Sequence, residues 1–361
     1  MKKKIIIFIP SIEDGGVEKN LYIITNYLSK KIKNINLLTY DDKYKNKFKK
    51  NIKIINPFFN FINFKNRYPK YFLCVLALFK ILLFDRNYLI LTFQANIFAI
   101  FISRILNIRI ISRSNSSPSG WSKNFFKQII FSYFLKKADA VIVNSKEFKK
   151  EMDKKYNIRT HCILNPFDFS KIKKLSLKKC RKIYSKDCLK IISVGRLTNQ
   201  KDFITLFKSI QNVYKIKIEL IVIGKGVDKE KLKNYIKENS LQKKIKLIGY
   251  QANPFKFIRQ ADIFVLTSRF EGSPNVLIEA QYLKKYIIST NCPTGPREIL
   301  NNGKYGSLVK LNDYKLISKI IQKYNNNFSI KNKIKAGYLN TKKYDYRVNC
   351  LKYYSLINKL I

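Results

Sequence analysis

The amino-acid sequence predicts an α/β protein with two doubly wound domains, each a parallel sheet covered by helices. Three observations lead to this class. The chain has 361 residues, more than a single hydrophobic core usually serves. Short runs of isoleucine, valine and leucine alternate with longer amphipathic segments from one end to the other. The apolar runs are continuous, as is typical of strands that are buried on both faces of a sheet.

The first half of the chain contains the apolar runs of one sheet. They predict strands at residues 5–10, 35–40, 88–93, 109–113, 140–144 and 161–165. Amphipathic patterns between them predict helices, for example at residues 17–30 and 124–137. The opening MKKKIIIFIP has an apolar run too short for a signal peptide. The segment YFLCVLALFKILLF, residues 71–84, predicts either a buried helix or a helix lying in a membrane interface.

The second half repeats the pattern after a polar, lysine-rich stretch. We expect a domain over residues 1–170, a linker over 171–188 and a second domain over 189–343. The strands predicted in the second domain are residues 189–194, 218–224, 245–250, 263–268, 286–290 and 307–309. The last residues, 344–361, predict a helix that packs back on the first domain. In such pairs of domains, ligands bind in a cleft at the carboxyl ends of the strands.

The net charge of +49 suggests a polyanionic partner, and nucleic acid is the first candidate. Recognition of phosphates and bases relies on arginine, however, and only twelve of the 72 basic residues are arginine. The lysines are spread along the whole chain and form no separate basic tail. We therefore expect no nucleic-acid partner, and an anionic membrane surface as a partner instead.

The six cysteines are scattered, with no C-x-x-C pair and no short metal-binding spacing. In a chain of this length they predict no disulfide framework. The expected location is the cytoplasm, peripheral on the inner face of the cytoplasmic membrane.

The stretch SRFEGSPNVLIEA, residues 268–280, carries the clearest candidate site. It predicts a strand end, a loop holding Glu271 and Gly272, and a helix holding Glu279. Ser273 is the expected N-cap, and Pro274 suits the first helical turn. The backbone N–H groups from Ser273 to Val276, with Asn275 among them, are expected to bind an anion. Carboxylates beside an anion site fit a ligand with hydroxyls and phosphates, such as a nucleotide sugar. The alternative is an ordinary loop with two surface glutamates.

Three further segments bear on this ligand. GRLTNQKD follows a predicted strand and offers Arg196 and Lys201 to a diphosphate. Gly15 and Gly16 stand between the first strand and the first helix, where a backbone can approach a ligand closely. IVIGKGVDK lacks the third glycine of a dinucleotide fingerprint, so we do not expect a nicotinamide cofactor.

The segments GRLTNQKD, GYQANPFKFIRQADIFVLTSRFEGSPNVLIEA and TNCPTGPREIL together resemble the family 4 retaining glycosyltransferases of the GT-B fold. The resemblance is dense from residue 189 to residue 309 and thinner in the first half, where GGVEKN, ADAVIVNSKEF and ILNPFD carry it. It implies two Rossmann-like domains facing a cleft. It also implies an enzyme of bacterial surface-polysaccharide assembly that uses a nucleotide sugar.

The resemblance also implies roles for individual residues. Glu271 would bind hydroxyls of the donor sugar, Glu279 would bind the ribose, and Arg196 and Lys201 would neutralise the departing diphosphate. The remaining donor-binding positions would be Gly15, Gly16, Tyr250, Gln251, Gly272, Ser273, Pro274, Asn275 and Val276. Many family members have a histidine after the strand at residues 109–113. This chain has SRSNSSPSGWSKN there, so Arg113, Ser114 and Asn115 become the acceptor-binding candidates.

The chain contains no D-x-D motif, the short metal clamp of the other large glycosyltransferase fold. We therefore expect no metal and no cofactor, with a UDP-sugar as the donor substrate. The predicted reaction moves a hexosyl or N-acetylhexosaminyl unit to a lipid-linked glycan. Two alternatives remain, a nucleotide-sugar epimerase of the same fold and a non-enzymatic polyanion-binding protein.

Overall fold

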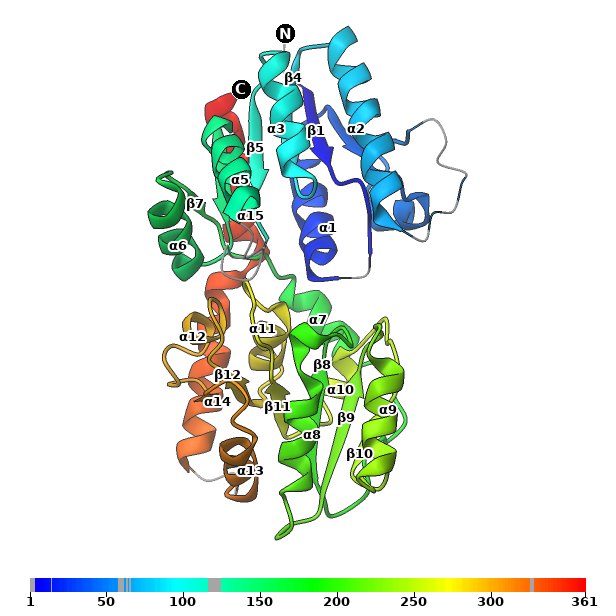
Figure 1. Ribbon diagram of the computed structural model, residues 1–361, viewed down its shortest axis with the longest axis vertical. Coiled ribbons are helices and arrows are strands. Elements are labelled where there is room, and N and C mark those ends of the chain that lie inside the picture. The colour runs from blue at the N-terminus through cyan, green and yellow to red at the C-terminus, as the bar shows by residue number, and fades with distance from the viewer. Residues whose placement is uncertain are drawn as a thin grey trace. The chain divides into compact units, whose positions relative to one another are not determined.

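The computed structural model describes residues 4–361, apart from residues 14, 58–61, 63, 65, 116–124 and 325–327. The chain divides into two compact units (Figure 1). The first consists of Met1–Phe167 together with Tyr344–Ile361, and the second is Asp168–Lys343. The second unit is thus inserted between two segments of the first.

The first unit is built on a seven-stranded parallel sheet of order β3-β2-β1-β4-β5-β6-β7. Its strands are β1 (Lys4–Phe8), β2 (Ile35–Leu38), β3 (Lys53–Ile55), β4 (Tyr88–Thr92), β5 (Ile110–Arg113), β6 (Ala140–Val143) and β7 (His161–Cys162). Ile5, Ile6 and Ile7 of β1 are fully buried, because helices cover both faces of the sheet. The sequence predicts six of these strands. It misses β3, a three-residue edge strand whose residues are only partly buried.

Each face of this sheet has its own apolar core. One core contains residues of α2 (Arg67–Phe84), α3 (Asn96–Ile105), α5 (Phe125–Lys137) and α6 (Lys146–Tyr156). The other contains residues of α1 (Gly16–Leu28) and α15 (Tyr346–Leu360). The C-terminal segment therefore belongs to the first unit, where Cys350, Tyr353 and Ile357 fill the core beneath α1.

The second unit has a six-stranded parallel sheet of order β10-β9-β8-β11-β12-β13. Its strands are β8 (Leu189–Val194), β9 (Ile218–Ile223), β10 (Ile245–Leu247), β11 (Ile263–Leu266), β12 (Tyr286–Thr290) and β13 (Ser307–Val309). All six are predicted from the sequence. The strand order reverses between β8 and β11, which pair in parallel, with Ile191 opposite Ile263. In doubly wound folds this is the point at which ligands bind.

The helices of the second unit pack around this sheet. They are α7 (Phe169–Ser176), α8 (Phe203–Gln211), α9 (Lys229–Glu238), α10 (Phe255–Ile258), α11 (Asn275–Tyr282), α12 (Pro296–Ile299), α13 (Tyr314–Gln322) and α14 (Phe328–Asn340). Side chains of α8, α9 and α13 share one apolar core with the sheet.

The expected linker at residues 171–188 differs from the structure. Helix α7 covers its first part, and Phe169 of that helix stacks on Tyr282 of α11 at 4.5 Å. The polar composition of this segment reflects a surface helix held by few apolar contacts. In the part of the chain that the structure describes, no helix combines the length and hydrophobicity needed to cross a membrane.

Candidate active site

Two loops of the second unit meet where its strand order reverses. One follows β8 and contains Arg196 and Lys201, and the other follows β11 and contains Glu271. Because parallel neighbouring strands end at the same edge, the two loops lie side by side. The structure thus brings together residues that are 70 positions apart in the sequence.

Hydrogen bonds join these loops into one rigid unit. The backbone N–H of Arg269 donates to the carbonyl of Gln200 at 2.8 Å. The Gln200 side chain returns a bond to the carbonyl of Phe270 at 2.9 Å. The Thr267 hydroxyl donates to the carbonyl of Lys201 at 3.0 Å. The backbone around Lys201 and Glu271 is therefore held in place before any ligand arrives.

An ion pair between Lys201 and Glu271 lies at the centre of the site. The Lys201 Nζ donates to Glu271 Oε1, and the Ser268 hydroxyl donates to the same oxygen at 2.6 Å. The side chains of Lys201 and Glu271 are only 13% and 9% exposed. Each charge neutralises the other. A ligand with a phosphate and a hydroxyl can replace both partners, since the phosphate suits the ammonium and the hydroxyl suits the carboxylate.

A left-handed glycine shapes the loop on the other side of Glu271. Gly295 precedes α12 with a φ of +84°, which favours glycine. A Cβ atom at this position would lie 2.7 Å from the Gly272 carbonyl oxygen and 2.8 Å from Pro274 Cδ. The Thr294 hydroxyl donates to the carbonyl of Glu271. The segment before α12 therefore supports the loop that enters α11.

Helix α11 begins one residue later than the sequence predicts. Pro274 is the N-cap, with φ −70° and ψ 105°, so Ser273 lies outside the helix. Because the ψ of Pro274 is extended, the first turn of α11 begins after the proline, at Asn275. Glu279 lies in α11 and is 1% exposed. The alternative of two surface glutamates is therefore wrong, because both carboxylates are buried.

The remaining candidates of the second unit are more open. Arg196 is exposed, directly after β8. Tyr250 is half exposed and lies under the ammonium of Lys225, which is 4.8 Å from the ring centroid. The Gln251 side chain donates to the carbonyl of Ile248 at 3.1 Å. These side chains are accessible to a ligand. Contacts of Tyr250 and Gln251 with the nucleotide base of the donor stay a prediction.

In the first unit, the glycine corner before α1 contains an acid that the sequence analysis overlooked. Gly15 is the N-cap of α1, and the Glu18 carboxylate accepts bonds from the backbone N–H groups of Glu13, at 3.3 Å, and Gly15, at 3.1 Å. This is the glutamate half of a capping box, since glycine has no side chain to return a bond, and a glutamate three residues after the N-cap is its sequence signal. Burial raises the pKa of Glu18 to about 7. Gly15 and Gly16 keep their predicted donor-binding role as a prediction.

Arg113, an acceptor-binding candidate, is buried at the end of β5, and its acceptor-binding role stays a prediction. Its guanidinium is 1% exposed and donates to the Tyr353 hydroxyl at 2.9 Å and to Asn165 at 2.8 Å. Ser114 is also buried, and the Asn115 amide donates to the carbonyl of Phe93 at 2.8 Å. These bonds tie the end of β5 to α15 and to neighbouring loops. The rest of the predicted acceptor loop, residues 116–124, lies outside the described residues.

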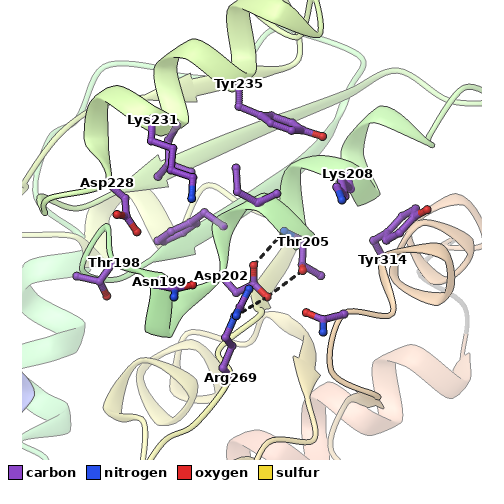
Figure 2. A pocket seen from close by; sticks show the side chains of 14 residues that line it. Thr198, Asn199, Asp202, Thr205, Lys208, Asp228, Lys231, Tyr235, Arg269 and Tyr314 are labelled. Atoms are coloured by element: carbon purple, nitrogen blue, oxygen red, sulfur yellow. Dashed lines mark hydrogen bonds and ion pairs between the residues drawn. The ribbon is translucent and has the colours of Figure 1, made fainter.

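A cavity of about 360 Å³ lies beside the candidate site, at the start of α8 and α9 (Figure 2). The Arg269 guanidinium reaches the Asp202 carboxylate at 3.2 Å, and Asp202 also accepts a bond from the Thr205 hydroxyl at 2.9 Å. The lining of this cavity includes neither Glu271 nor Glu279. We interpret this cavity as a gap between helix ends, separate from the chemistry.

The described residues contain no group of three or more histidine, cysteine, aspartate or glutamate side chains placed to hold a metal ion. The Cys292 thiol interacts electrostatically with the Glu271 carboxylate, and burial raises the pKa of the thiol to about 12. A thiol with this pKa stays protonated and is a poor nucleophile.

A family comparison covers most of the second unit. Residues 178–337 match the family described as Glycosyl transferases group 1. This matched stretch makes up less than half of the chain. It contains Arg196, Lys201 and Glu271, in the loops at the reversal point of the sheet, and Glu279 on α11.

Curated relatives of the chain are also named as glycosyltransferases. The chain is 36% identical over 221 residues to an uncharacterized glycosyltransferase of Methanocaldococcus jannaschii, covering 54% of each protein. It is 29% identical over 213 residues to a Campylobacter jejuni N-acetylgalactosaminyltransferase that acts on a diphospho-undecaprenol-linked glycan, covering 57% of each. The chain thus spans about half the length of these relatives. Further relatives have names from lipopolysaccharide, capsular polysaccharide and amylovoran biosynthesis.

The solved structures extend the likeness to the whole chain. The structure of Anabaena HepE in complex with UDP-glucose has a TM-score of 0.81 and 17% identity, and covers 99% of this chain and 100% of that one. At this identity the likeness shows the fold. The fold is that of the GT-B glycosyltransferases, two parallel-sheet α/β domains, as the sequence predicts.

Proposed function

We propose that this protein is a glycosyltransferase that moves a hexosyl or N-acetylhexosaminyl unit from a UDP-sugar to a lipid-linked glycan in surface-polysaccharide biosynthesis. The observation that carries the proposal is the buried Lys201–Glu271 pair at the reversal point of the group 1 domain. A fixed cation beside a fixed carboxylate suits a ligand with a diphosphate next to a hydroxyl-rich sugar.

The proposed chemistry follows from the charge that develops as the donor breaks. When the bond from the anomeric carbon to the diphosphate oxygen lengthens, negative charge grows on the leaving phosphate. Lys201 and Arg196 stabilise that charge, with the backbone N–H groups at the start of α11. Glu271 accepts bonds from sugar hydroxyls, and Glu279 accepts bonds from the ribose. The acceptor hydroxyl oxygen forms the new bond to the anomeric carbon and passes its proton to the leaving diphosphate, which keeps the electron pair of the broken bond.

The identity of the donor and acceptor rests on relatives. The Anabaena structure, with the same fold, was solved with UDP-glucose. The Campylobacter relative is named for an acceptor on diphospho-undecaprenol. The Anabaena structure supports a UDP-sugar donor for this chain, and the Campylobacter relative supports a lipid-linked glycan acceptor. Retention of the anomeric configuration is proposed from the family resemblance, and product NMR tests it.

We also propose that the reaction needs no metal ion and no cofactor. The support is the pair of cations, Lys201 and Arg196, in the loop after β8. Two positive side chains can neutralise a diphosphate in the way that a divalent cation does in other enzymes. Turnover in the presence of EDTA tests this point directly.

The deciding experiment measures UDP or GDP release from a panel of nucleotide sugars, with membrane lipid extract as the acceptor source and EDTA present. We expect turnover with one UDP-sugar. Glu271→Gln should lower kcat/KM by about 100-fold or more, because a neutral amide binds sugar hydroxyls and Lys201 less well. The matched control is Glu230→Gln, an exposed glutamate on α9 that pairs with Lys233. It should retain wild-type activity.

Two results would contradict the proposal. The first is no turnover of any nucleotide sugar by protein that is folded by circular dichroism. Retention on heparin would then favour the polyanion-binding alternative. The second is conversion of a UDP-sugar to its epimer without transfer, which would favour the epimerase.

A further inference from the structure

The outer surface of helices α2, α3 and α5 in the first unit is unusually apolar. Among the described residues, thirteen of the twenty-five exposed large hydrophobic side chains lie on these three helices. The second unit, of similar size, has eight, and they are spread over many elements. A concentration of this kind on one face marks an interaction surface. We call the exposed apolar residues of the three helices the apolar face.

Helix α2 supplies the longest part of the apolar face. Its buried side, formed by Cys74, Leu78 and Leu82, packs on the sheet. A second stripe, separated by three or four residues along the helix, points away from the core, and its members are Tyr68, Phe72, Leu76, Phe79 and Leu83. Phe72 and Tyr68 are 64% and 66% exposed. An 18-residue helix with two apolar sides therefore has one side that its own domain does not cover.

Helices α3 and α5 continue the face. Phe98, Phe101 and Ile105 of α3 are exposed at the spacing of one helix side. On α5 the exposed side chains are Phe126, Ile129, Ile130 and Tyr133, opposite the buried Leu135. The Phe101 ring contacts Phe134 of α5 edge-on at 6.1 Å. The three helices lie side by side on one side of the sheet, with α3 in the middle (Figure 1).

The charge of the three helices has a single sign. Their sequences contain the basic residues Arg67, Lys70, Lys80, Arg104, Lys127, Lys136 and Lys137 and no aspartate or glutamate. Three nearby carboxylates form ion pairs: Asp85 with Lys4 at 2.6 Å, Asp139 with Arg104 at 2.6 Å, and Asp41 with Lys70 at 2.7 Å. Arg104 and Lys70 therefore add no net charge, and Arg67, Lys80, Lys127, Lys136 and Lys137 supply the positive charge of the three helices. The apolar face is thus set among positive charges.

The opposite side of the same sheet looks different. There α1 has no exposed large apolar side chain, and α15 has Val348 and Leu351. The net charge of the whole protein is strongly positive, so charge alone does not distinguish the two sides. What distinguishes them is the combination of protruding aromatic rings with lysines and arginines.

We propose that α2, α3 and α5 form a docking surface for an anionic lipid bilayer, with the apolar face inserted among the acyl chains and the basic side chains at the headgroups. The helices would lie in the plane of the interface. The inference goes beyond the proposed transfer reaction. Its test uses no sugar substrate, so either proposal can fail alone.

The chemistry favours a bilayer over a protein partner. Aliphatic and phenyl groups spread over three neighbouring helices need a broad apolar phase, and lysines at the edges need distributed negative charge. An anionic bilayer offers both, at any position along its surface. No helix in the described ranges is able to span the bilayer, so attachment at the interface is the mode that fits.

Vesicle flotation tests the apolar contribution. The full chain is mixed with vesicles of equal parts phosphatidylglycerol and phosphatidylcholine, or of phosphatidylcholine alone. We expect binding to the first and at least about tenfold weaker binding to the second. Phe72→Ser combined with Leu76→Ser should reduce binding to anionic vesicles by about tenfold or more. The control, Val348→Ser with Leu351→Ser on α15, removes two exposed apolar side chains from the opposite side and should bind like wild type.

A second pair of variants tests the charge. Lys80→Glu with Lys136→Glu changes two exposed lysines of α2 and α5. It should weaken binding about tenfold or more. Lys352→Glu with Lys359→Glu makes the same change in net charge on α15 and should have a much smaller effect. If α2 variants unfold, Phe126→Ser with Ile130→Ser on α5 replaces them.

Three outcomes would overturn the proposal. Equal binding to neutral and anionic vesicles would remove the charge argument. Equal losses in the α2 and α15 variants would show that binding is not confined to this face. A wild-type dimer in solution that Phe72→Ser with Leu76→Ser converts to a monomer, without vesicle binding, would assign the face to a second copy of the chain.

Discussion

At the scale of single residues, the pairing of Lys201 with Glu271 is the central interaction of the candidate site. Both side chains are mostly buried, and each is the other's counter-charge. Removing one partner of such a pair is costly, because the remaining charge has lost water and found no replacement. The pair therefore contributes both to the stability of the fold and to the proposed activity, and single and double variants can separate the two contributions.

We predict that Lys201→Met lowers both quantities. The free energy of unfolding should fall by about 3 kcal/mol, because Glu271 loses its cation. The kcat/KM for UDP release should fall about 100- to 1000-fold, because the leaving diphosphate loses its stabilisation. Urea unfolding and nucleotide-release assays measure the two effects.

Adding Glu271→Gln to Lys201→Met should restore most of the stability and none of the activity. The control is Lys233→Met, which breaks the exposed pair with Glu230. It should change the free energy of unfolding by less than about 0.5 kcal/mol. A Lys201→Met protein with wild-type kcat/KM would contradict the assignment of this lysine.

Glu18 gives a pH-dependent prediction. Burial raises its pKa to about 7, so the folded protein holds this proton more tightly than the unfolded chain does. Its contribution to stability is therefore full below about pH 4 and is lost as the pH rises through about 7. Glu18→Gln cannot ionise. Over this window the free energy of unfolding of the wild type should fall by roughly 3 kcal/mol relative to that of Glu18→Gln. The Tm of the wild type should therefore fall relative to that of the variant.

Thermal unfolding from about pH 4 to about pH 8 measures this difference. Glu230→Gln, which removes an exposed carboxylate, serves as the control and should show no such divergence. Parallel Tm profiles for the wild type and Glu18→Gln would mean that Glu18 titrates normally.

At the scale of elements, the site depends on how tightly neighbouring loops pack. The loop before α12 supports the loop before α11 through Gly295, where a side chain has no room. The same edge of the sheet contains Gly224, at which a Cβ atom would lie 1.8 Å from the Gly195 carbonyl oxygen. Gly224 allows the ends of β9 and β8 to approach closely, and Gly295 does the same for the loops after β12 and β11.

We predict that Gly295→Ala lowers kcat/KM about tenfold or more and destabilises the fold by about 1–3 kcal/mol. The new methyl group must displace the Gly272 carbonyl or Pro274, and this moves the entry to α11. Gly303→Ala is the matched control. Its φ of +89° brings similar backbone strain, but the nearest atom to its Cβ is 3.8 Å away.

Gly303→Ala should therefore lose stability and keep its activity. The assays are urea unfolding and nucleotide release. If both variants lose activity equally, backbone strain rather than the contact with Gly272 is the cause.

At the scale of the whole molecule, the two units have separate cores, and the second unit is inserted between two segments of the first. The second unit is one continuous segment, Asp168–Lys343. The first needs both ends of the chain, because Tyr353 and Ile357 of α15 complete the core under α1. Tyr353 also accepts the bond from the buried Arg113.

We predict that residues 168–343 fold alone and unfold cooperatively in urea. If this unit binds the donor, UDP at 100 times its Kd should raise the free energy of unfolding by about 2.7 kcal/mol. A chain ending at residue 343 should lose the cooperative unfolding of the first unit, because it exposes the core that α15 covers. Retention of both transitions in that truncated chain would contradict the division.

Much of this fold could be predicted from the sequence, because burial on both faces gives parallel strands continuous apolar runs. The runs at β4 and β9 are examples, with every residue buried. The edge strand β3 could not be predicted in this way, since its residues are partly exposed and its pairing with β2 alone defines it. The linker expectation failed for a similar reason, because α7 is a helix on a polar surface segment.

Local patterns along the chain were enough to predict the class of the fold and the residue types of the site. Which residues meet depends on the three-dimensional packing of the strands and helices. This packing paired Lys201 with Glu271 across 70 positions, buried Arg113 against Tyr353 across 240, and left one side of α2, α3 and α5 uncovered. The physical reason is that burial and ion pairing depend on neighbours in space, and strand order chooses those neighbours.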